Sequence, residues 1–419
     1  PPLTDVHPMT TEFAAPLAYL VSRYPAVSHT FILREVIRLR ELGHRIHTAS
    51  INAPDRLLEA MDPAERVEAD ATYFVKADGA RGALAGLAFW AVRAPGKLLG
   101  AIVQGLRMGR GLRGLAYAVE AAMVARWMRR HDMAHLHVHF GNAGASVGVL
   151  VKVLTGCHLS YTIHGPDEFD DVSGQRLAMK MHAADAVVCI SQFARGQLMR
   201  ISAPLDWAKF QVCRLGVDPR QFTFVAPAEG QSHIRMLCVG RLTPAKGQVL
   251  LVQACAQLRD TGLDFSVTLV GDGPDRTRVE QAIAELDLQQ HVKLAGSLTQ
   301  DGVRRALAQS DIFVLPSLAE GIPVVLMEAM SSGVPCVSTP VNGIPELIEH
   351  GRTGMLATPG DAESLARHLL SLAHNEGLRR EIALCAREKV RSHFDLARNV
   401  QQLSGVFAGF PRAPVTLQS

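Results

Sequence analysis

Short apolar runs alternate with segments of helical periodicity along nearly all of the 419 residues. The runs expected to form strands in the first half are 17–22, 45–51, 134–140, 159–163 and 186–190. Between the first two, residues 30–42 carry apolar side chains at helical spacing and end at Gly43. Strands that alternate with helices run parallel, in a sheet that helices cover on both faces. The sequence therefore predicts an α/β protein.

The same alternation restarts after about residue 220. The expected strands and helices of this second series are 236–239, 247–259, 266–270, 276–286, 311–315, 325–332 and 335–338. Between the two series, residues 216–233 combine Pro, Gly and small polar residues without periodicity, which is typical of a linker. Because a domain usually has roughly 100–200 residues, the chain is long enough for two.

The composition argues against several classes of protein. The 43 basic and 40 acidic residues leave a net charge of only +3, whereas a nucleic-acid binder usually carries a strong basic excess. The seven cysteines include no C-x-x-C pair, so a structural zinc site or a redox dithiol is not expected, and their scatter favours a reducing compartment. The first residues lack a signal-peptide pattern, and the apolar stretch 82–92 is shorter than the roughly 20 residues that span a bilayer. We expect a cytoplasmic protein.

Residues 76–130 differ from the rest of the chain in charge. They hold ten basic residues against two acids, Asp78 and Glu120, with Leu, Met, Phe89 and Trp90 interleaved. A basic amphipathic surface of this kind is typical of a protein that rests on anionic lipid, here the inner face of the plasma membrane. A pair of ordinary helices with solvated arginines would have the same composition, so that alternative stays open.

Residues 315–361 contain two glutamates that are candidates for ligand binding. Glu320 follows an expected strand, and Glu328 lies on the helix expected to begin near Val324. Free backbone N–H groups and the positive end of the dipole make a helix start suitable for an anion. Gly321, in the turn before this helix, has no Cβ, so a ligand can approach the backbone closely.

Arg241 and Lys246 lie in a second candidate segment, between an expected strand and an expected helix. Ligands of open α/β sheets bind at this carboxyl edge of the strands. Arg forms bidentate contacts with phosphate and Lys supplies a point charge. Two such cations facing the helix start would neutralise a diphosphate.

These segments occur in the order of a known family. Residues 320–337 match E-G-x-P-x-x-x-x-E-A-M-x-x-G-x-P-x-V, and residues 240–247 match G-R-L-x-x-x-K-G. Together with LVGDGP at 269–274 and NGIPE at 342–346, they make the second half resemble the retaining glycosyltransferases of family 4, which have the GT-B fold.

The first half resembles a narrower group within that family, the transferases of bacterial exopolysaccharide, capsule and colanic-acid-type synthesis. Residues 24–32, YPAVSHTFI, resemble the F-P-x-x-S-E-T-F-I segment of this group, except that Tyr24 replaces Phe and His29 replaces Glu. The segments 137–141 and 161–167 resemble two further stretches of the group.

The resemblance implies a fold and a role for each domain. It implies two Rossmann-like domains that face each other across a cleft. Residues 1–218 would bind the acceptor and residues 219–394 the nucleotide-sugar donor, while residues 395–419 would cross back onto the first domain.

The resemblance also implies roles for single residues. Arg241 and Lys246 would hold the donor diphosphate, and Glu328 would bind the ribose. Glu320 would bind the transferred sugar, with His164 across the cleft near the reacting carbon. The other implied donor contacts are Ser297 and Leu298 near the base, and Gly321, Ile322, Pro323 and Val324 near the sugar. The acceptor-side candidates are Ser28, His29, Thr30 and His139.

Two other kinds of site have partial patterns. His135, His137 and His139 alternate, so a strand would place them on one face, but no Cys or carboxylate stands at ligand spacing and we expect no metal site. Gly271 and Gly273 follow a strand as in a dinucleotide fingerprint, but Arg276 stands at the third glycine position.

We therefore expect a metal-independent, retaining hexosyltransferase without a cofactor, acting on a UDP- or GDP-sugar and a lipid-linked oligosaccharide. Same-face attack, with the leaving phosphate assisting deprotonation of the acceptor, would suit a site rich in phosphate-neutralising groups and poor in general bases. The alternatives are a nucleotide-sugar epimerase or phosphorylase on the same fold and, more remotely, a dinucleotide-dependent oxidoreductase.

Overall fold

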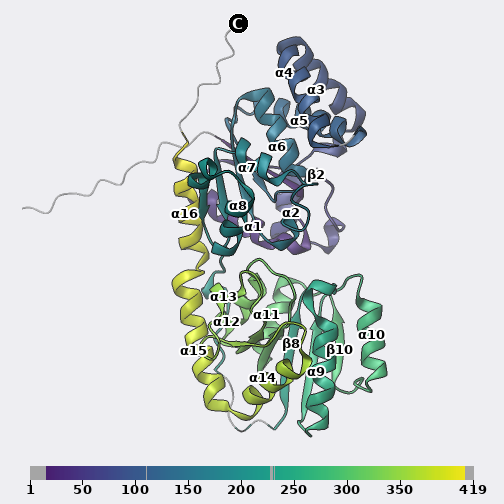
Figure 1. Cartoon of the computed structure of the whole chain (residues 1–419), viewed down its shortest axis with the longest axis vertical. Helices are drawn as coiled ribbons and strands as arrows, with labels where there is room; N and C mark the ends of the chain where they lie inside the picture. The colour runs from purple at the N-terminus through teal and green to yellow at the C-terminus, as the bar shows by residue number, and fades with distance from the viewer. Residues whose placement is uncertain (1–15, 110, 227–229, 231, 411–419) are drawn as a thin grey trace, which may run out of the picture.

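Two α/β domains, one above the other in Figure 1, make up the structure, a computed structural model that describes residues 16–109, 111–226, 230 and 232–410. The first domain contains a parallel sheet with the strand order β3-β2-β1-β4-β5-β6-β7 among the described residues. Its strands are β1 (Leu17–Arg23), β2 (Ile46–Asn52), β3 (Tyr73–Phe74), β4 (His135–His139), β5 (His158–Ile163), β6 (Ala186–Cys189) and β7 (Phe210–Val212).

The second domain contains a parallel sheet with the order β10-β9-β8-β11-β12-β13 among the described residues. Its strands are β8 (Ile234–Val239), β9 (Phe265–Val270), β10 (Val292–Gly296), β11 (Ile312–Leu315), β12 (Cys336–Ser338) and β13 (Met355–Leu356). The predicted α/β class with two parallel-sheet domains is confirmed.

Helices cover both faces of each sheet, as the buried strands require. The α-helices of the first domain are α1 (Thr30–Glu41), α2 (Pro63–Ala71), α3 (Gly79–Arg93), α4 (Pro95–Met108), α5 (Leu112–Arg130), α6 (Ala143–Thr155), α7 (Leu177–Ala183) and α8 (Gln192–Ile201). Those that follow are α9 (Gln248–Asp260), α10 (Arg276–Glu285), α11 (Gln300–Ala308), α12 (Val324–Ser332), α13 (Ile344–Leu347), α14 (Ala362–His374), α15 (Glu376–His393) and α16 (Leu396–Ala408).

Strand β1 shows how one strand serves two cores. Its side chains alternate between the faces of the sheet, so Ala18 and Leu20 join the core under α5 and α6. Tyr19 and Val21 point to the opposite face, where they pack with residues of α1 and α16. The first sheet is therefore buried on both sides.

The C-terminal helices connect the two domains. Helix α15 packs on the second domain, and α16 places Val400, Leu403 and Phe407 in the core beneath α1 (Figure 1). Between these helices, Val217 N donates to Phe394 O at 3.0 Å and Leu396 N donates to Val217 O at 2.9 Å. The predicted return of 395–419 is seen for the described part up to residue 410, and residues 411–419 lie outside it.

The basic segment forms three helices, α3, α4 and α5, rather than the pair considered from the sequence. They lie at the end of the first domain that is distant from the second domain (Figure 1). Helices α3 and α4 pack on the third helix, α5, and not directly on the sheet. In this contact, the buried indole N–H of Trp90 on α3 donates to Ala122 O on α5 at 3.2 Å. Within the described part of the chain, no helix has the length and apolarity needed to cross a membrane.

Candidate active site

The loop after β8 places the predicted phosphate-binding cations at the carboxyl edge of the second sheet. It continues as a short 3-10 turn, Pro244–Lys246, into α9. Gly247 has a φ of +67°, and a Cβ there would collide with the carbonyl oxygen of Pro316, so the loop is pressed against the one after β11. Arg241 lies exposed in this loop, and Lys246 is half-buried.

Lys246 pairs with the predicted sugar-binding residue. Its Nζ lies 2.5 Å from Oε1 of Glu320, which also accepts a hydrogen bond from Ser317 Oγ at 2.7 Å. Glu320 is buried, so the ion pair and the hydroxyl offset the cost of removing its charge from water. The structure thus joins two residues 74 positions apart that the sequence assigned separately.

The turn at Gly321 lies where the two domains meet, a contact surface that we call the seam. A Cβ on Gly321 would collide with the carbonyl oxygen of His164 in the first domain, and one on Gly343 would collide with Gly321 itself. We predicted that the missing Cβ leaves room for a ligand. The structure corrects this reason, because the opposite domain occupies that space. Ile322 is buried, Pro323 precedes α12, and Val324 begins that helix, whose N-terminus has no side-chain cap.

Glu328, the predicted ribose ligand, has a partner from the first domain. Arg34 on α1 places one Nη2 atom 2.7 Å from Glu328 Oε1 and 3.2 Å from Oε1 of Gln300. Sequence reasoning missed Arg34 and Gln300. The only signal was that Arg34 interrupts an apolar helical pattern, which is ordinary for a surface helix. Ser297 and Leu298 lie exposed just before α11, which begins at Gln300.

Two of the acceptor-side candidates, His29 and His139, lie beside aromatic rings at the edge of the first sheet. Ser28 is exposed and Thr30 begins α1, while the His29 ring lies 4.8 Å from that of Phe140. Burial lowers the pKa of His29, and the positive charge of Arg241 in the other domain adds to this effect. The start of α1 therefore faces the donor loop.

His139 and His164 are in direct contact. His139 ends β4 and His164 follows β5, and these neighbouring strands bring Nδ1 of His139 within 2.9 Å of Nε2 of His164. Both rings are buried. Burial, followed by the nearby histidines, holds the pKa of His164 well below its ordinary value, so this imidazole is neutral at physiological pH.

Glu168 lies in the short 3-10 turn Pro166–Glu168 that follows β5. It is buried and accepts hydrogen bonds from the backbone N–H groups of Gly141, His164 (2.6 Å) and Gly165 (2.9 Å). Burial raises its pKa to about 7, although these hydrogen bonds oppose the rise. The carboxylate is buried because three unpaired N–H groups at the strand ends require an acceptor.

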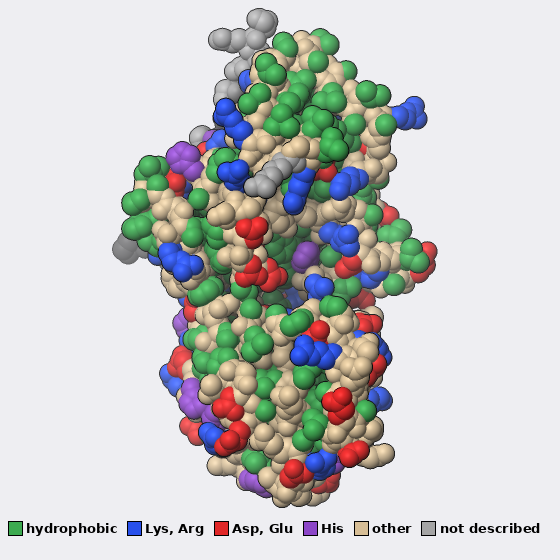
Figure 2. All heavy atoms as spheres, turned by 45° about the vertical axis from the view of Figure 1, so that its right-hand side comes forward, with side chains coloured by type: hydrophobic (Ala, Val, Ile, Leu, Met, Phe, Trp, Pro, Cys, Tyr) green, Lys and Arg blue, Asp and Glu red, His purple; other side chains and the backbone are tan. Residues whose placement is uncertain are grey.

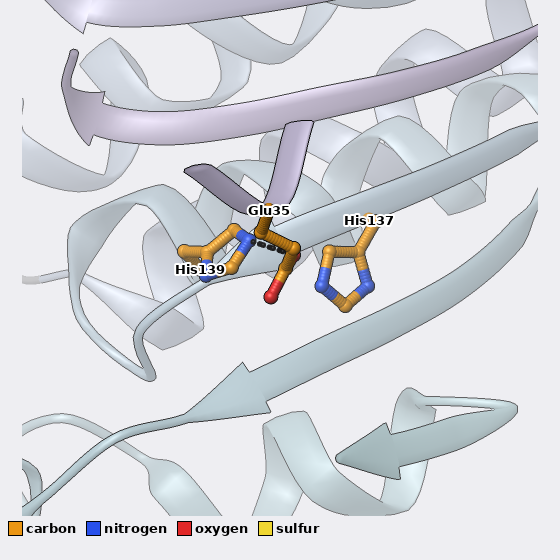
Figure 3. A group of neighbouring side chains, drawn as sticks. All are labelled: Glu35, His137 and His139. Atoms are coloured by element: carbon orange, nitrogen blue, oxygen red, sulfur yellow. Dashed lines mark ion pairs between the residues drawn. The ribbon is translucent and has the colours of Figure 1, made fainter. Parts of the chain in front are cut away.

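His139 also belongs to a group of three side chains that could hold a metal. Ligand atoms of Glu35, His137 and His139 all fall within 4.8 Å of one another (Figure 3). Our reason for expecting no metal site, the lack of a carboxylate at ligand spacing, was wrong, because α1 supplies Glu35 from a distant part of the sequence. Both ring nitrogens of His137 already have hydroxyl partners, Ser160 Oγ at 2.7 Å and Thr162 Oγ1 at 2.9 Å.

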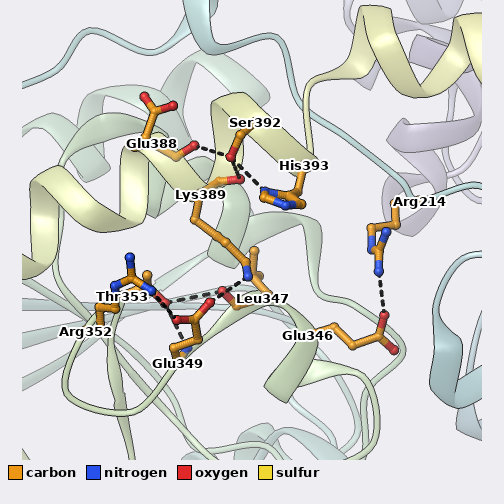
Figure 4. A network of polar contacts seen from close by, with 10 residues as sticks. All are labelled: Arg214, Glu346, Leu347, Glu349, Arg352, Thr353, Glu388, Lys389, Ser392 and His393. Carbon is orange, nitrogen blue, oxygen red and sulfur yellow. Dashed lines mark hydrogen bonds and ion pairs between the residues drawn. The ribbon is translucent and has the colours of Figure 1, made fainter.

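Glu346 on α13 forms further polar contacts across the seam. It accepts from the backbone N–H of Phe193 at 2.9 Å and from Arg214 at 3.3 Å, both in the first domain. Figure 4 shows the contact with Arg214. Three residues on, Glu349 pairs with Lys389 of α15 at 2.7 Å. The seam thus combines charged contacts between the domains with a site whose cations and carboxylates suit a diphosphate and sugar hydroxyls.

Comparisons with known proteins identify the family. Residues 29–221 match the model for Glycosyltransferase Family 4, and residues 220–389 match the model for Glycosyl transferases group 1. The amylovoran biosynthesis glycosyltransferase AmsK of Erwinia amylovora is 32% identical over 93% of this chain and 98% of its own length. The putative colanic acid biosynthesis glycosyltransferase WcaL of Salmonella typhimurium is 29% identical, with the same coverage.

A solved structure supports the fold. HepE of Anabaena, crystallised in complex with UDP-glucose, has a TM-score of 0.71 over 94% of this chain and all of that one, at 19% identity. The family matches favour a transferase over the epimerase, phosphorylase and oxidoreductase alternatives. With both domain models matched in order and a full-length relative above 30% identity, this chain is a member of the GT-B glycosyltransferases.

Proposed function

We propose that this protein transfers a hexose from a UDP- or GDP-sugar to a lipid-linked oligosaccharide in exopolysaccharide synthesis, with retention of the anomeric configuration. The observation that carries the proposal is the Lys246–Glu320 pair beside the uncapped start of α12. Its charges suit a sugar diphosphate. The names of the amylovoran and colanic acid relatives support the pathway class, and the UDP-glucose bound to HepE supports the donor class.

In this mechanism, residues of the second domain would hold the donor. Arg241 and Lys246 would neutralise the diphosphate as it leaves, and the N–H groups at Val324 would add the helix dipole. Glu328 would accept hydrogen bonds from the ribose, and Glu320 from the transferred sugar. Ser297 and Leu298 would lie near the base. No metal or cofactor is part of the proposal.

Residues of the first domain would receive the acceptor. His164 meets the Gly321 turn across the seam and contacts His139, and we propose that Ser28, His29 and Thr30 at the start of α1 line the same acceptor side. Closure of the two domains would exclude water and limit hydrolysis of the donor.

A donor screen tests the proposal. We expect UDP or GDP to raise the melting temperature of the protein, because a ligand that binds only the folded state stabilises it, and ADP to have a smaller effect. NMR of the product anomer, formed with a lipid-linked acceptor, should show the donor's configuration. An inverted product would contradict retention, and no response to any nucleotide would contradict the donor site.

We further propose that α3 and α4 rest on an anionic membrane surface, so that the protein is peripheral at the inner face of the plasma membrane. Exposed apolar side chains and basic residues gather at this end of the molecule (Figure 2). The exposed apolar residues are Leu84, Val92, Leu99, Val103, Leu106, Leu112 and Leu115. Apolar insertion and attraction to anionic headgroups act together on such a surface.

Vesicle flotation tests this contact. We expect binding to vesicles with anionic phospholipid, and a several-fold loss of binding in the combined variant Lys97→Glu, Arg107→Glu and Arg113→Glu. Arg110 belongs to the predicted patch but lies outside the described residues. The matched control is Arg352→Glu, an exposed arginine of the second domain. Equal binding of the patch variant and the control would contradict the proposal.

A further inference from the structure

A chain of buried polar contacts leads from the interior of the first domain to His164. Glu35 on α1 accepts a hydrogen bond from Tyr19 Oη at 2.8 Å, and its Oε1 lies 3.2 Å from Nε2 of His139. Nδ1 of His139 lies 2.9 Å from Nε2 of His164. All four side chains are less than 9% exposed, so water does not screen these contacts.

The charge of Glu35 selects one tautomer for each histidine. A neutral imidazole has one N–H and one bare nitrogen. The carboxylate attracts the hydrogen of His139 to Nε2, although the angle there is not that of an aligned hydrogen bond. Nδ1 of His139 is then bare and accepts from Nε2–H of His164, which leaves Nδ1 of His164 without a hydrogen.

This bare nitrogen has no partner of its own. Nδ1 of His164 is buried and makes no hydrogen bond among the described residues. A buried polar atom without a partner destabilises the folded protein, and a hydroxyl group of a ligand would remove this cost. The rings of Phe31 and Phe140, at 4.8 Å and 4.5 Å, hold the imidazole in place.

We propose that Glu35 and His139 are positioning residues that present Nδ1 of His164 as a hydrogen-bond acceptor for a hydroxyl group of the sugar substrates. This inference rests on the proposed function and adds the two residues behind His164. Neither belongs to a local motif of the donor site, and no proton has to leave the chain during the reaction. The group recognised is a hydroxyl donor, not a phosphate oxygen, because a bare nitrogen repels an anionic acceptor.

His137 supplies a matched control. It is two residues from His139 on the same strand and is equally buried, but both of its nitrogens bond to Ser160 and Thr162. The His137 ring packs against Tyr19 and His139 but makes no hydrogen bond with either, so a variant at position 137 tests the loss of a buried ring while it leaves the polar contacts that lead to His164 in place.

The first experiment measures the tautomer directly and needs no substrate. In protein labelled with 15N-histidine, with the His164 signal assigned from His164→Asn, we expect Nδ1 of His164 to show the shift of a nitrogen without hydrogen. His139→Asn keeps an acceptor oxygen near the place of Nδ1 and should preserve this state. His139→Leu and Glu35→Met should shift it, whereas His137→Leu should not. A hydrogen on Nδ1 in the unmodified protein would overturn the inference.

The second experiment measures turnover, and its failure is distinguishable from failure of the proposed function. We expect His139→Leu to lower kcat about 10- to 100-fold while leaving the Kd for the nucleoside diphosphate unchanged, and His139→Asn to stay within a few-fold of the unmodified protein. An equal loss of kcat in His137→Leu and His139→Leu would overturn the inference, since packing would then explain both. Loss of nucleotide binding in every protein would instead contradict the donor site.

Discussion

The two halves of the site are built from different kinds of contact. In the second domain, charged side chains on adjacent loops meet, as Lys246 and Glu320 do. In the first domain, neutral rings and hydrogen bonds predominate, with His139 on His164 and Phe140 beside both. In the function that we propose, the second half would recognise an anionic donor and the first half would recognise hydroxyl groups. This difference explains why substitutions should affect the two halves differently.

The largest effect should come from the charged half. We expect Lys246→Ala and Glu320→Gln each to lower kcat/KM about 1,000-fold, because each removes one partner of an ion pair in which Glu320 is buried, together with a proposed contact to the donor. Initial rates at varied donor concentration measure this. The control is Lys293→Ala, an exposed lysine on β10. If both variants kept the rate of the control, the charged half would not be the donor site.

A smaller effect should appear in the free energy of unfolding of the protein, through Glu168 in the first domain. The pKa of Glu168 is raised to about 7, so the folded protein retains a proton that the unfolded chain releases near pH 4.5. The folded protein therefore loses stability as the pH rises from 5 to 7. From this one carboxyl we expect a loss of about 2 kcal/mol at pH 7 relative to pH 5. The pKa of Lys180 is lowered to about 7, so this residue makes the folded protein more stable as the pH rises, but only above pH 7.

Urea unfolding at pH 5, 6 and 7 checks the Glu168 prediction. We expect the stability of the unmodified protein relative to Glu168→Gln to fall across this range. The variant Asp170→Asn, at an exposed position two residues away, should show no such trend. A constant difference between the protein and Glu168→Gln would mean that Glu168 does not titrate in this window.

Arg34 connects the two halves, and its loss should have the smallest effect of the three. We expect Arg34→Ala to weaken the binding of UDP or GDP about tenfold, or about 1.4 kcal/mol, because the guanidinium orients Glu328. Isothermal calorimetry measures the change. Arg38→Ala is the matched control, one turn along α1 and paired with Glu41. Tighter binding in Arg34→Ala would show instead that Arg34 competes with the ribose for Glu328.

The sequence predicted the second half of the site better than the first, because the two halves join residues at different separations along the chain. The strand ends and loops of the second domain are contiguous segments, so the motifs predicted β8, β11 and α12 to within a residue or two of their observed bounds. The contacts of the first half join α1 to strands that lie about 100 residues later. Glu35 and Arg34 therefore look like ordinary charges of an amphipathic helix until the tertiary structure brings them to His139 and Glu328.

The paired backbone between the domains has a mechanical consequence. Two connections cross from one domain to the other side by side, the linker at Gly216–Asp218 and the segment at Phe394–Leu396. Gly216 is in close contact with the second segment, because a Cβ there would lie 2.7 Å from Leu396 N and from Phe394 O. A double hydrogen-bonded strap resists torsion more than a single strand does, while it still allows bending. The domains should therefore open by one swing about a shared hinge, and a proteolytic cut in either connection would leave them tethered by the other.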